Sequence, residues 1–278
     1  MQIAKVIGLM TGLTLLMVLA GGYLGGTNGA IIAFVFSIAM NFGSYWFSDR
    51  MVLRMYRARE IGPRDAPELY EMVERLARRA GLPTPTVAIS PQPQPNAFAT
   101  GRNPEHGVVC FTEGILRALP MEELEGVTAH ELGHIKHRHM LVGSIAATMA
   151  GAITLLASIA RWGLIFGGGN RDGDNPLASL LMLFLAPVAA FVIQTAISRQ
   201  NEFQADATAA EIAGTPRGLA AALGRLDAMS RQIPMRIDPG AAQLAIVNPL
   251  AGRPGGFRRL FSTHPPTEER IARLLGRG

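Results

Sequence analysis

The sequence predicts a mainly α-helical fold of the α+β type, with a small β-sheet and four transmembrane helices. Four apolar runs, at residues 6–24, 30–47, 140–160 and 177–197, are long enough to cross a hydrocarbon core as helices. Outside them, apolar residues recur at helical spacing and two short stretches are typical of strands. We therefore expect a helical hairpin over residues 1–48 and a second domain over 49–278, interrupted by an apolar hairpin at about 140–197.

Composition places the chain among membrane proteins. The mean hydropathy is +0.22 and 49% of the residues are hydrophobic. The net charge is +5, but no nucleic-acid-binding motif accompanies it, so we expect no nucleic-acid partner. Arginines beside the apolar runs are instead interpreted as topology determinants and contacts to the lipid bilayer. The single cysteine, Cys110, excludes an intramolecular disulfide.

The first two apolar runs predict the N-terminal hairpin. A glycine-rich turn at residues 25–29 separates them. A cleaved signal peptide is the alternative for the first run, but the second run follows almost at once, which favours an uncleaved helix. Tyr45 and Trp46 are suited to the membrane interface. Four arginines follow the second run: Arg50, Arg54, Arg57 and Arg59. By the positive-inside rule, both ends of the hairpin then lie in the cytoplasm.

The chain after the hairpin resembles that of a soluble domain. Asp65 and Glu68 predict a capping box at the start of a helix, and Gly81 predicts its end. Residues 86–89 and 106–111 are typical of strands. Between these strands lies the stretch Asn96, Ala97, Phe98, Ala99 and Thr100. It is either an ordinary hairpin strand or a sheet edge on which an extended peptide binds as an added strand.

The stretch from His130 to His134 carries the pattern H-E-x-x-H. On an α-helix the two histidines lie on one face and can direct their ring nitrogens at one point. Zinc suits such a pair, and Glu131 beside it can take a proton from a zinc-bound water. The alternative is an amphipathic helix with two ordinary histidines.

A catalytic zinc site needs a third protein ligand. His137 is excluded, because it stands about 10 Å from His130 along a helix axis. The metzincin pattern is excluded too, because His137 and Met140 occupy its glycine and third histidine positions.

Apolar runs three and four suggest where the third ligand comes from. If they form an antiparallel hairpin, Glu202 returns to the membrane surface at which His134 lies. Two histidines and a glutamate are an established catalytic zinc set. Asp206, one turn later, can accept the free ring N–H of a zinc histidine. A solvated helix face is the alternative for Glu202 and Asp206, and a shallow hairpin packed on the domain is the alternative to full crossing.

Four motifs together resemble the HtpX family of membrane-bound zinc metalloproteases, which is related more distantly to the C-a-a-X prenyl proteases. The motifs are HELGHI at 130–135, SRQNEFQAD at 198–206, NAFATG at 96–101 and FSTHPP at 261–266. The resemblance implies a zincin-like α+β domain on the cytoplasmic side of a bacterial inner membrane. One zinc ion would be bound by His130, His134 and Glu202, and Glu131 would be the catalytic base. A role in membrane-protein quality control under stress is also implied.

The C-terminal segment supplies further candidates. Leu219, Leu223, Leu226 and Met229 form a helical stripe suited to core packing, and residues 233–256 predict a loop over the cleft. His264 and Arg270 are candidate catalytic residues that would stabilise the developing oxyanion. A structural His-Pro-Pro turn is the alternative for His264, and a surface arginine or one paired with a carboxylate is the alternative for Arg270.

The sequence therefore predicts an integral membrane zinc endopeptidase that cleaves misfolded or damaged membrane proteins or unfolded polypeptides. Glu131 would activate the zinc-bound water. One alternative is a peptidase for lipidated C-termini, which needs a large intramembrane chamber. Another is a non-enzymatic module in which zinc only stabilises the fold. The sequence predicts no particular oligomeric state.

Overall fold

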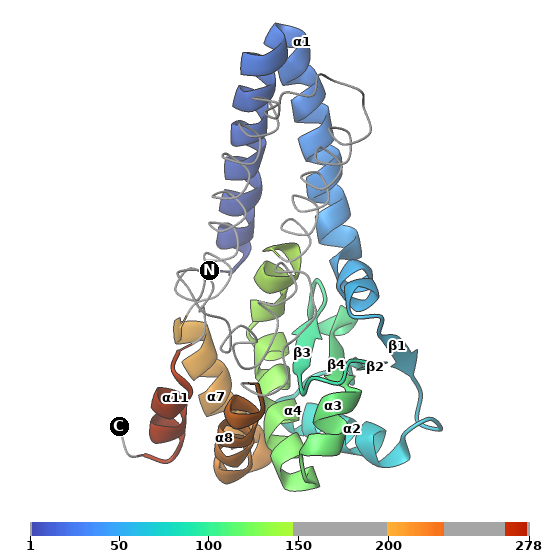
Figure 1. Cartoon of the computed structure of the whole chain (residues 1–278), viewed down its shortest axis with the longest axis vertical. Coiled ribbons are helices and arrows are strands. Elements are labelled where there is room, and N and C mark those ends of the chain that lie inside the picture. The colour runs from blue at the N-terminus through green and yellow to red at the C-terminus, as the bar shows by residue number, and fades with distance from the viewer. Residues whose placement is uncertain (1, 147–198, 231–264, 277–278) are drawn as a thin grey trace, which may run out of the picture.

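A computed structural model describes residues 2–146, 199–230 and 265–276 of the chain. A long helical hairpin projects from a body in which a small sheet and several helices pack together (Figure 1). Most of the third apolar run, all of the fourth, residues 233–256 and His264 lie outside the described residues.

Helix α1 (Gln2–Met55) forms the hairpin and is broken at Gly25 and Gly26. Gly26 has φ +57°, a conformation that favours glycine. The two arms approach each other closely at Gly21 and Gly29, where a Cβ on either residue would overlap the carbonyl oxygen of the other. Small residues allow this kind of close packing between membrane helices.

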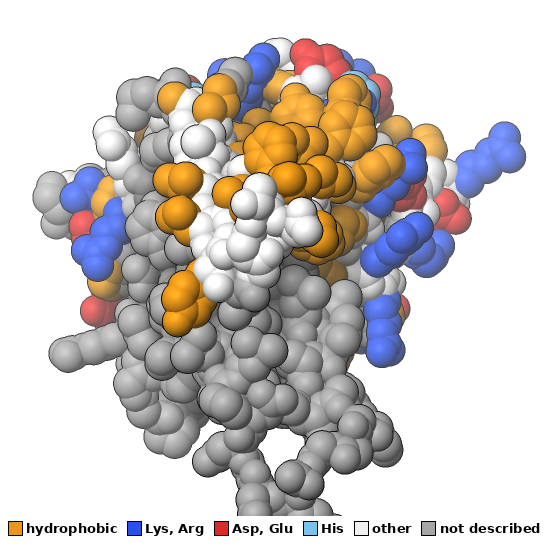
Figure 2. Space-filling view, turned by 90° about the horizontal axis from the view of Figure 1, so that it is seen from above, with side chains coloured by type: hydrophobic (Ala, Val, Ile, Leu, Met, Phe, Trp, Pro, Cys, Tyr) orange, Lys and Arg blue, Asp and Glu red, His pale blue; other side chains and the backbone are white. Residues whose placement is uncertain are grey.

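Two segments of α1, Val6–Tyr23 and Gly25–Met55, are long and apolar enough to cross a membrane. Large apolar side chains, among them Ile32, Phe34 and Val35, are exposed on the second arm. Seen from the hairpin end, apolar side chains cover much of the described surface, and Lys and Arg lie toward the rim (Figure 2). The structure thus describes two candidate membrane helices, where the sequence predicts four.

The sheet contains β1 (Arg59–Ile61), β2 (Thr86–Ser90), β3 (Ala97–Thr100) and β4 (Val108–Thr112), in the order β1-β2-β4-β3. The central pair β2–β4 is parallel and both outer pairs are antiparallel. The two strands predicted from the sequence are confirmed, although β4 starts later than expected. Residues Pro104–His106 instead form the short helix η1, in which Asn103 accepts the N–H of His106.

The second arm of α1 is anchored on one face of this sheet. It continues to Met55, past the boundary predicted at residue 48, because Val52, Leu53 and Tyr56 pack against the sheet. Their partners are Ala88, Phe98, Val108 and Cys110. Alternate residues of the strands point to the opposite face and join the main core, which contains α2 (Pro67–Ala80) and α4 (Met121–Lys136).

Helix α2 ends as predicted at Gly81, which is left-handed with φ +69°. The predicted capping box is wrong, because Ala66 is the N-cap and makes no side-chain bond. Asp65 instead accepts the N–H of Gly62 at 2.7 Å and stabilises the turn before the helix. After β4, the short helix α3 (Glu113–Ala118) leads to α4.

Helix α4 lies at the centre of the body. It contacts α7 (Arg199–Ala213) and α8 (Arg217–Ser230), and α11 (Thr267–Leu274) packs on both of these (Figure 1). Gly133 allows α7 to lie close, because a Cβ there would stand 3.1 Å from the carbonyl oxygen of Ala205. The predicted leucine stripe is buried: Leu219, Leu223 and Leu226.

Candidate metal centre

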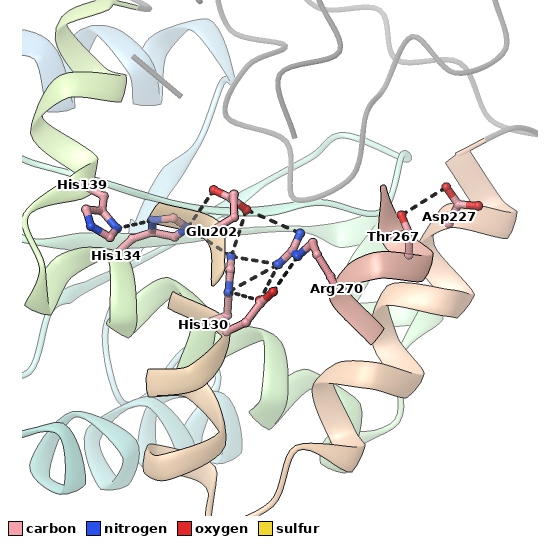
Figure 3. Close-up of polar contacts among 8 residues, drawn as sticks. His130, His134, His139, Glu202, Asp227, Thr267 and Arg270 are labelled. Atoms are coloured by element: carbon pink, nitrogen blue, oxygen red, sulfur yellow. Dashed lines mark hydrogen bonds and ion pairs between the residues drawn. The ribbon is translucent and has the colours of Figure 1, made fainter. Parts of the chain in front are cut away.

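Three side chains from two helices meet beside the sheet. His130 and His134 project from α4, and Glu202 projects from the first turn of α7 (Figure 3). The two Nε2 atoms are 3.1 Å apart. The carboxylate oxygens of Glu202 lie 3.8 Å from Nε2 of His130 and 3.5 Å from Nε2 of His134. The sequence-predicted ligand set is thus brought together in space.

The spacing of these atoms fits a metal ion. One ligand atom from each residue can be chosen so that all lie within 4.8 Å of one another. Ligands about 2.0–2.1 Å from a tetrahedral zinc stand roughly 3.3 Å apart, close to the observed separations. Among the residues that the structure describes, this is the one group of three or more His, Cys, Asp or Glu with that geometry.

Asp206 lies against the far side of the His130 ring. The Nδ1 atom of His130 is 2.9 Å from a carboxylate oxygen of Asp206. Donation of the Nδ1–H to this carboxylate leaves the Nε2 lone pair facing the cluster. Burial raises the pKa of Asp206, but hydrogen bonds from Arg270 and His130 hold it at about 2, so the carboxylate stays ionised.

Arg270 reaches the site from α11 and is 2% exposed. Its Nε and Nη2 atoms donate to the two carboxylate oxygens of Asp206 at 2.9 and 2.7 Å. Its Nη1 atom lies 3.5 Å from Glu202. Of the alternatives open for this arginine, the structure shows the pairing with carboxylates, which balances the buried negative charge. A role toward the oxyanion stays a prediction.

Glu131 stands next to the cluster and is also buried. Burial raises the pKa of its carboxyl to about 7, against the opposing effects of His130 and of a hydrogen bond from the Ala99 N–H. A general base is most effective when its pKa lies near the working pH. The arrangement therefore suits Glu131 to accepting and returning a proton.

Strand β3 passes beside Glu131 at the edge of the sheet. The Thr112 N–H donates to the Asn96 carbonyl at 2.9 Å. In an antiparallel pair, alternate residues bond to the neighbouring strand, so the backbone groups of Phe98 also face β4. The backbone groups of Ala97 and Ala99 point to the opposite side, away from β4. No described strand pairs with that outer edge, although Ala97 and Ala99 are buried. Of the residues in the predicted substrate edge, Ala97 and Ala99 direct backbone groups there, because the backbone groups of Asn96, Phe98 and Thr100 face β4.

Sequence reasoning missed His139. Helix α4 ends at Lys136, Arg138 takes a left-handed conformation with φ +58°, and a new helical segment starts at His139. This turn places Nδ1 of His139 3.2 Å from Nδ1 of His134. No glycine or proline marks the break, so the histidine-rich composition of residues 137–139 is the only signal available from the sequence.

Comparisons with known proteins find a matching family model, similar sequences and a similar structure. The model of peptidase family M48 matches residues 63–278. The chain is 55% identical to a protein named Protease HtpX homolog from Desulfatibacillum aliphaticivorans, over 98% of this chain and 88% of the relative. It is 58% identical to one from Gemmatimonas aurantiaca, over 97% of each chain. The crystal structure of S. mikatae Ste24p matches with a TM-score of 0.49 and 22% identity, over 98% of this chain and 63% of that one.

Proposed function

The chain belongs to peptidase family M48 as an HtpX-type metalloprotease, and from this premise we propose that it is a zinc-dependent endopeptidase acting on misfolded or damaged membrane proteins. The observation that carries the proposal is the buried His-His-Glu cluster with the carboxylate of Glu131 beside it. Two imidazoles and one carboxylate form a set that favours zinc over harder cations.

In the proposed reaction, His130, His134 and Glu202 would hold the zinc ion. When bound, the ion supplies a Lewis acid for a peptide carbonyl and for water. Glu131 takes a proton from the attacking water as the oxygen bonds to the carbonyl carbon. The same carboxyl then passes that proton to the leaving amine as the C–N bond breaks.

Arg270 and Asp206 would act through the ligands. Asp206 holds the His130 ring, while Arg270 fixes Asp206 and lies beside Glu202. Partners of this kind orient metal ligands and are themselves held by hydrogen bonds.

The substrate chain would bind as an extra strand on the unpaired edge of β3, after displacing the groups that bury Ala97 and Ala99. The N–H and C=O groups of Ala97 and the C=O of Ala99 offer main-chain hydrogen bonds that require no particular substrate side chain. The N–H of Ala99 faces Glu131, so the reacting peptide would lie near that end of the strand. This mode suits unfolded chains of varied sequence.

The apolar hairpin supports a location in the bacterial inner membrane. Arginines in the last turns of the second arm and just after it, at positions 50, 54, 57 and 59, favour a cytoplasmic site. The protein substrates would then be membrane proteins reached from the cytoplasm.

Replacing Glu131 by Gln tests the proposal most directly. We expect Glu131→Gln to retain about one zinc per chain, since its ligands are unchanged, and to lose hydrolysis by at least about 100-fold. The assay uses full-length protein in proteoliposomes with a destabilised membrane protein, alongside metal analysis. Glu122→Gln, an exposed change on the same helix, is the matched control and should leave both properties unchanged. Full activity in Glu131→Gln would refute the proposed base.

A further inference from the structure

The two histidines of the cluster have different partners on their outer ring nitrogens. His130 faces the ionised carboxylate of Asp206. His134 instead faces the ring of His139, and the Nδ1 atoms of the two rings are 3.2 Å apart. His139 is 6% exposed, and its contact with His134 appears in Figure 3.

A row of side chains continues outward from His139. The Gln204 side chain, on α7, hydrogen-bonds to His139. Its Nε2 atom also lies 3.3 Å from Nδ1 of His137. The Nε2 atom of His137 is in turn 2.8 Å from the hydroxyl of Thr208.

The donors and acceptors in this row have one consistent order. The amide nitrogen of Gln204 donates to His137, so its amide oxygen is left to accept the Nε2–H of His139. With its hydrogen on Nε2, His139 presents a lone pair on Nδ1. That lone pair can accept the Nδ1–H of His134, which leaves the Nε2 lone pair of His134 directed at the cluster.

We propose that His139 is a positioning residue that fixes the ring orientation and tautomer of His134, and that Gln204 fixes the tautomer of His139. This proposal rests on the proposed role of His134 as a zinc ligand. His139 does for His134 what Asp206 does for His130, but without adding a negative charge close to the ion. A second carboxylate there would weaken the positive charge that zinc offers to the peptide carbonyl.

The zinc affinity of two variants tests this role. We expect His139→Leu to weaken zinc binding about 10- to 100-fold, the usual effect of losing such a partner. His139→Asn should restore the affinity to within about threefold, because its Oδ1 atom occupies the same bond position as Nδ1 of histidine and is also an acceptor. If His139 served only in packing, the leucine variant should bind zinc more tightly than the asparagine variant. The order of the two zinc affinities therefore distinguishes positioning from packing.

The measurement is competition with a chelator on full-length protein in detergent. His106→Leu is the control, since His106 is an exposed histidine on η1 whose ring contacts Asn103, the residue before that helix. Zinc binding and hydrolysis by the unsubstituted protein test the proposed function separately. Equal affinity in His139→Leu and the unsubstituted protein would overturn the proposal, as would an asparagine variant no better than leucine.

A second measurement needs no substitution. Nitrogen-15 NMR of the histidine-labelled, zinc-loaded protein distinguishes ring nitrogens with and without hydrogen. We expect hydrogen on Nδ1 of His134 and on Nε2 of His139. The reverse tautomer of His139 would overturn the proposal.

Discussion

At the scale of single residues, the environment that suits Glu131 to proton transfer also lowers the stability of the folded protein. Its carboxyl has a pKa of about 7 in the folded chain and an ordinary value of 4.5. Folding therefore takes up a proton between these values, and stability falls as the pH rises from about 4.5 to about 7. The difference corresponds to on the order of 3 kcal/mol. A carboxyl suited to proton transfer thus destabilises the protein at neutral pH.

We expect Glu131→Gln to remove this pH-dependent loss. The metal-free variant should unfold at a higher temperature than the parent at about pH 8, and the two should nearly coincide at about pH 5. Thermal scans with a chelator at both pH values measure the difference. An equal difference in unfolding temperature between the two proteins at both pH values would show that the pKa of the Glu131 carboxyl is not raised.

Arg270, unlike Glu131, stabilises the folded protein, because its buried charge pairs with the carboxylates of Asp206 and Glu202. Replacing it by Met leaves Asp206 and Glu202 buried without their cation, which costs about 3–5 kcal/mol when one partner of such a pair is removed. We expect Arg270→Met to unfold at lower denaturant concentration and to bind zinc more weakly. Arg273→Met, on the same helix but more exposed, is the control and should change stability far less. Equal effects of the two changes would contradict the role given to Arg270.

At the scale of elements, the packing of α7 on α4 determines where Glu202 lies. At Gly133 a Cβ would stand 3.1 Å from the Ala205 carbonyl oxygen and 3.2 Å from its Cα, so α7 would have to move by a few tenths of an ångström. Glu202 is on that helix, one turn earlier. We expect Gly133→Ala to weaken zinc binding about tenfold without unfolding the protein, because small displacements of ligands reduce metal affinity.

The control for this prediction is Gly224→Ala on α8. There the nearest atom to a new Cβ is Ile271 Cδ1 at 3.9 Å, an ordinary contact. The change should stabilise the protein by about 0.5–1 kcal/mol through helix propensity and leave zinc binding unaltered. Chelator competition and thermal scans on both variants provide the measurements. Unchanged affinity in Gly133→Ala would show that the position of Glu202 tolerates movement of α7.

Local patterns explain which elements the sequence could predict. The i and i+4 spacing of His130 and His134 specifies one helix face, and the return of an apolar hairpin predicts that Glu202 lies near them. The turn at Arg138 has no glycine or proline to mark it, and the helical segment that follows it packs against α1. Asp65 matches a capping pattern but is bound to Gly62. The partners of Arg270 depend on tertiary packing, so the sequence left alternatives open there.

At the scale of the whole molecule, β3 connects the metal centre to the membrane hairpin. Phe98 packs against Tyr56, with the rings tilted and their centroids 4.3 Å apart. The Thr100 hydroxyl lies 2.7 Å from that of Ser144, in the helical segment that packs on the first arm of α1. Arg102 lies over the Trp46 ring at 5.0 Å from its centroid. The strand therefore runs from Glu131 toward the side chains expected at the membrane interface.

This arrangement predicts how near to the bilayer a substrate can be cut. From Ala99 to Arg102 is three residues, which span at most roughly 10 Å at about 3.3 Å per residue. A polypeptide paired with β3 would cover the same distance from the interface to the reacting peptide bond. We expect cleavage to begin about three to five residues beyond the end of a substrate's membrane span.

Single-span substrates with an unfolded tail of uniform sequence test this prediction. Reconstituted with the full-length protease in proteoliposomes, they should yield cut sites from about the third to fifth tail residue onward, mapped by mass spectrometry. The same tail without its span, added to the solution, should be cut more slowly and at no fixed distance from its end, because nothing holds it beside β3. Cuts confined to positions far from the span would mean that the metal centre faces away from the bilayer, and that β3 does not guide chains out of it.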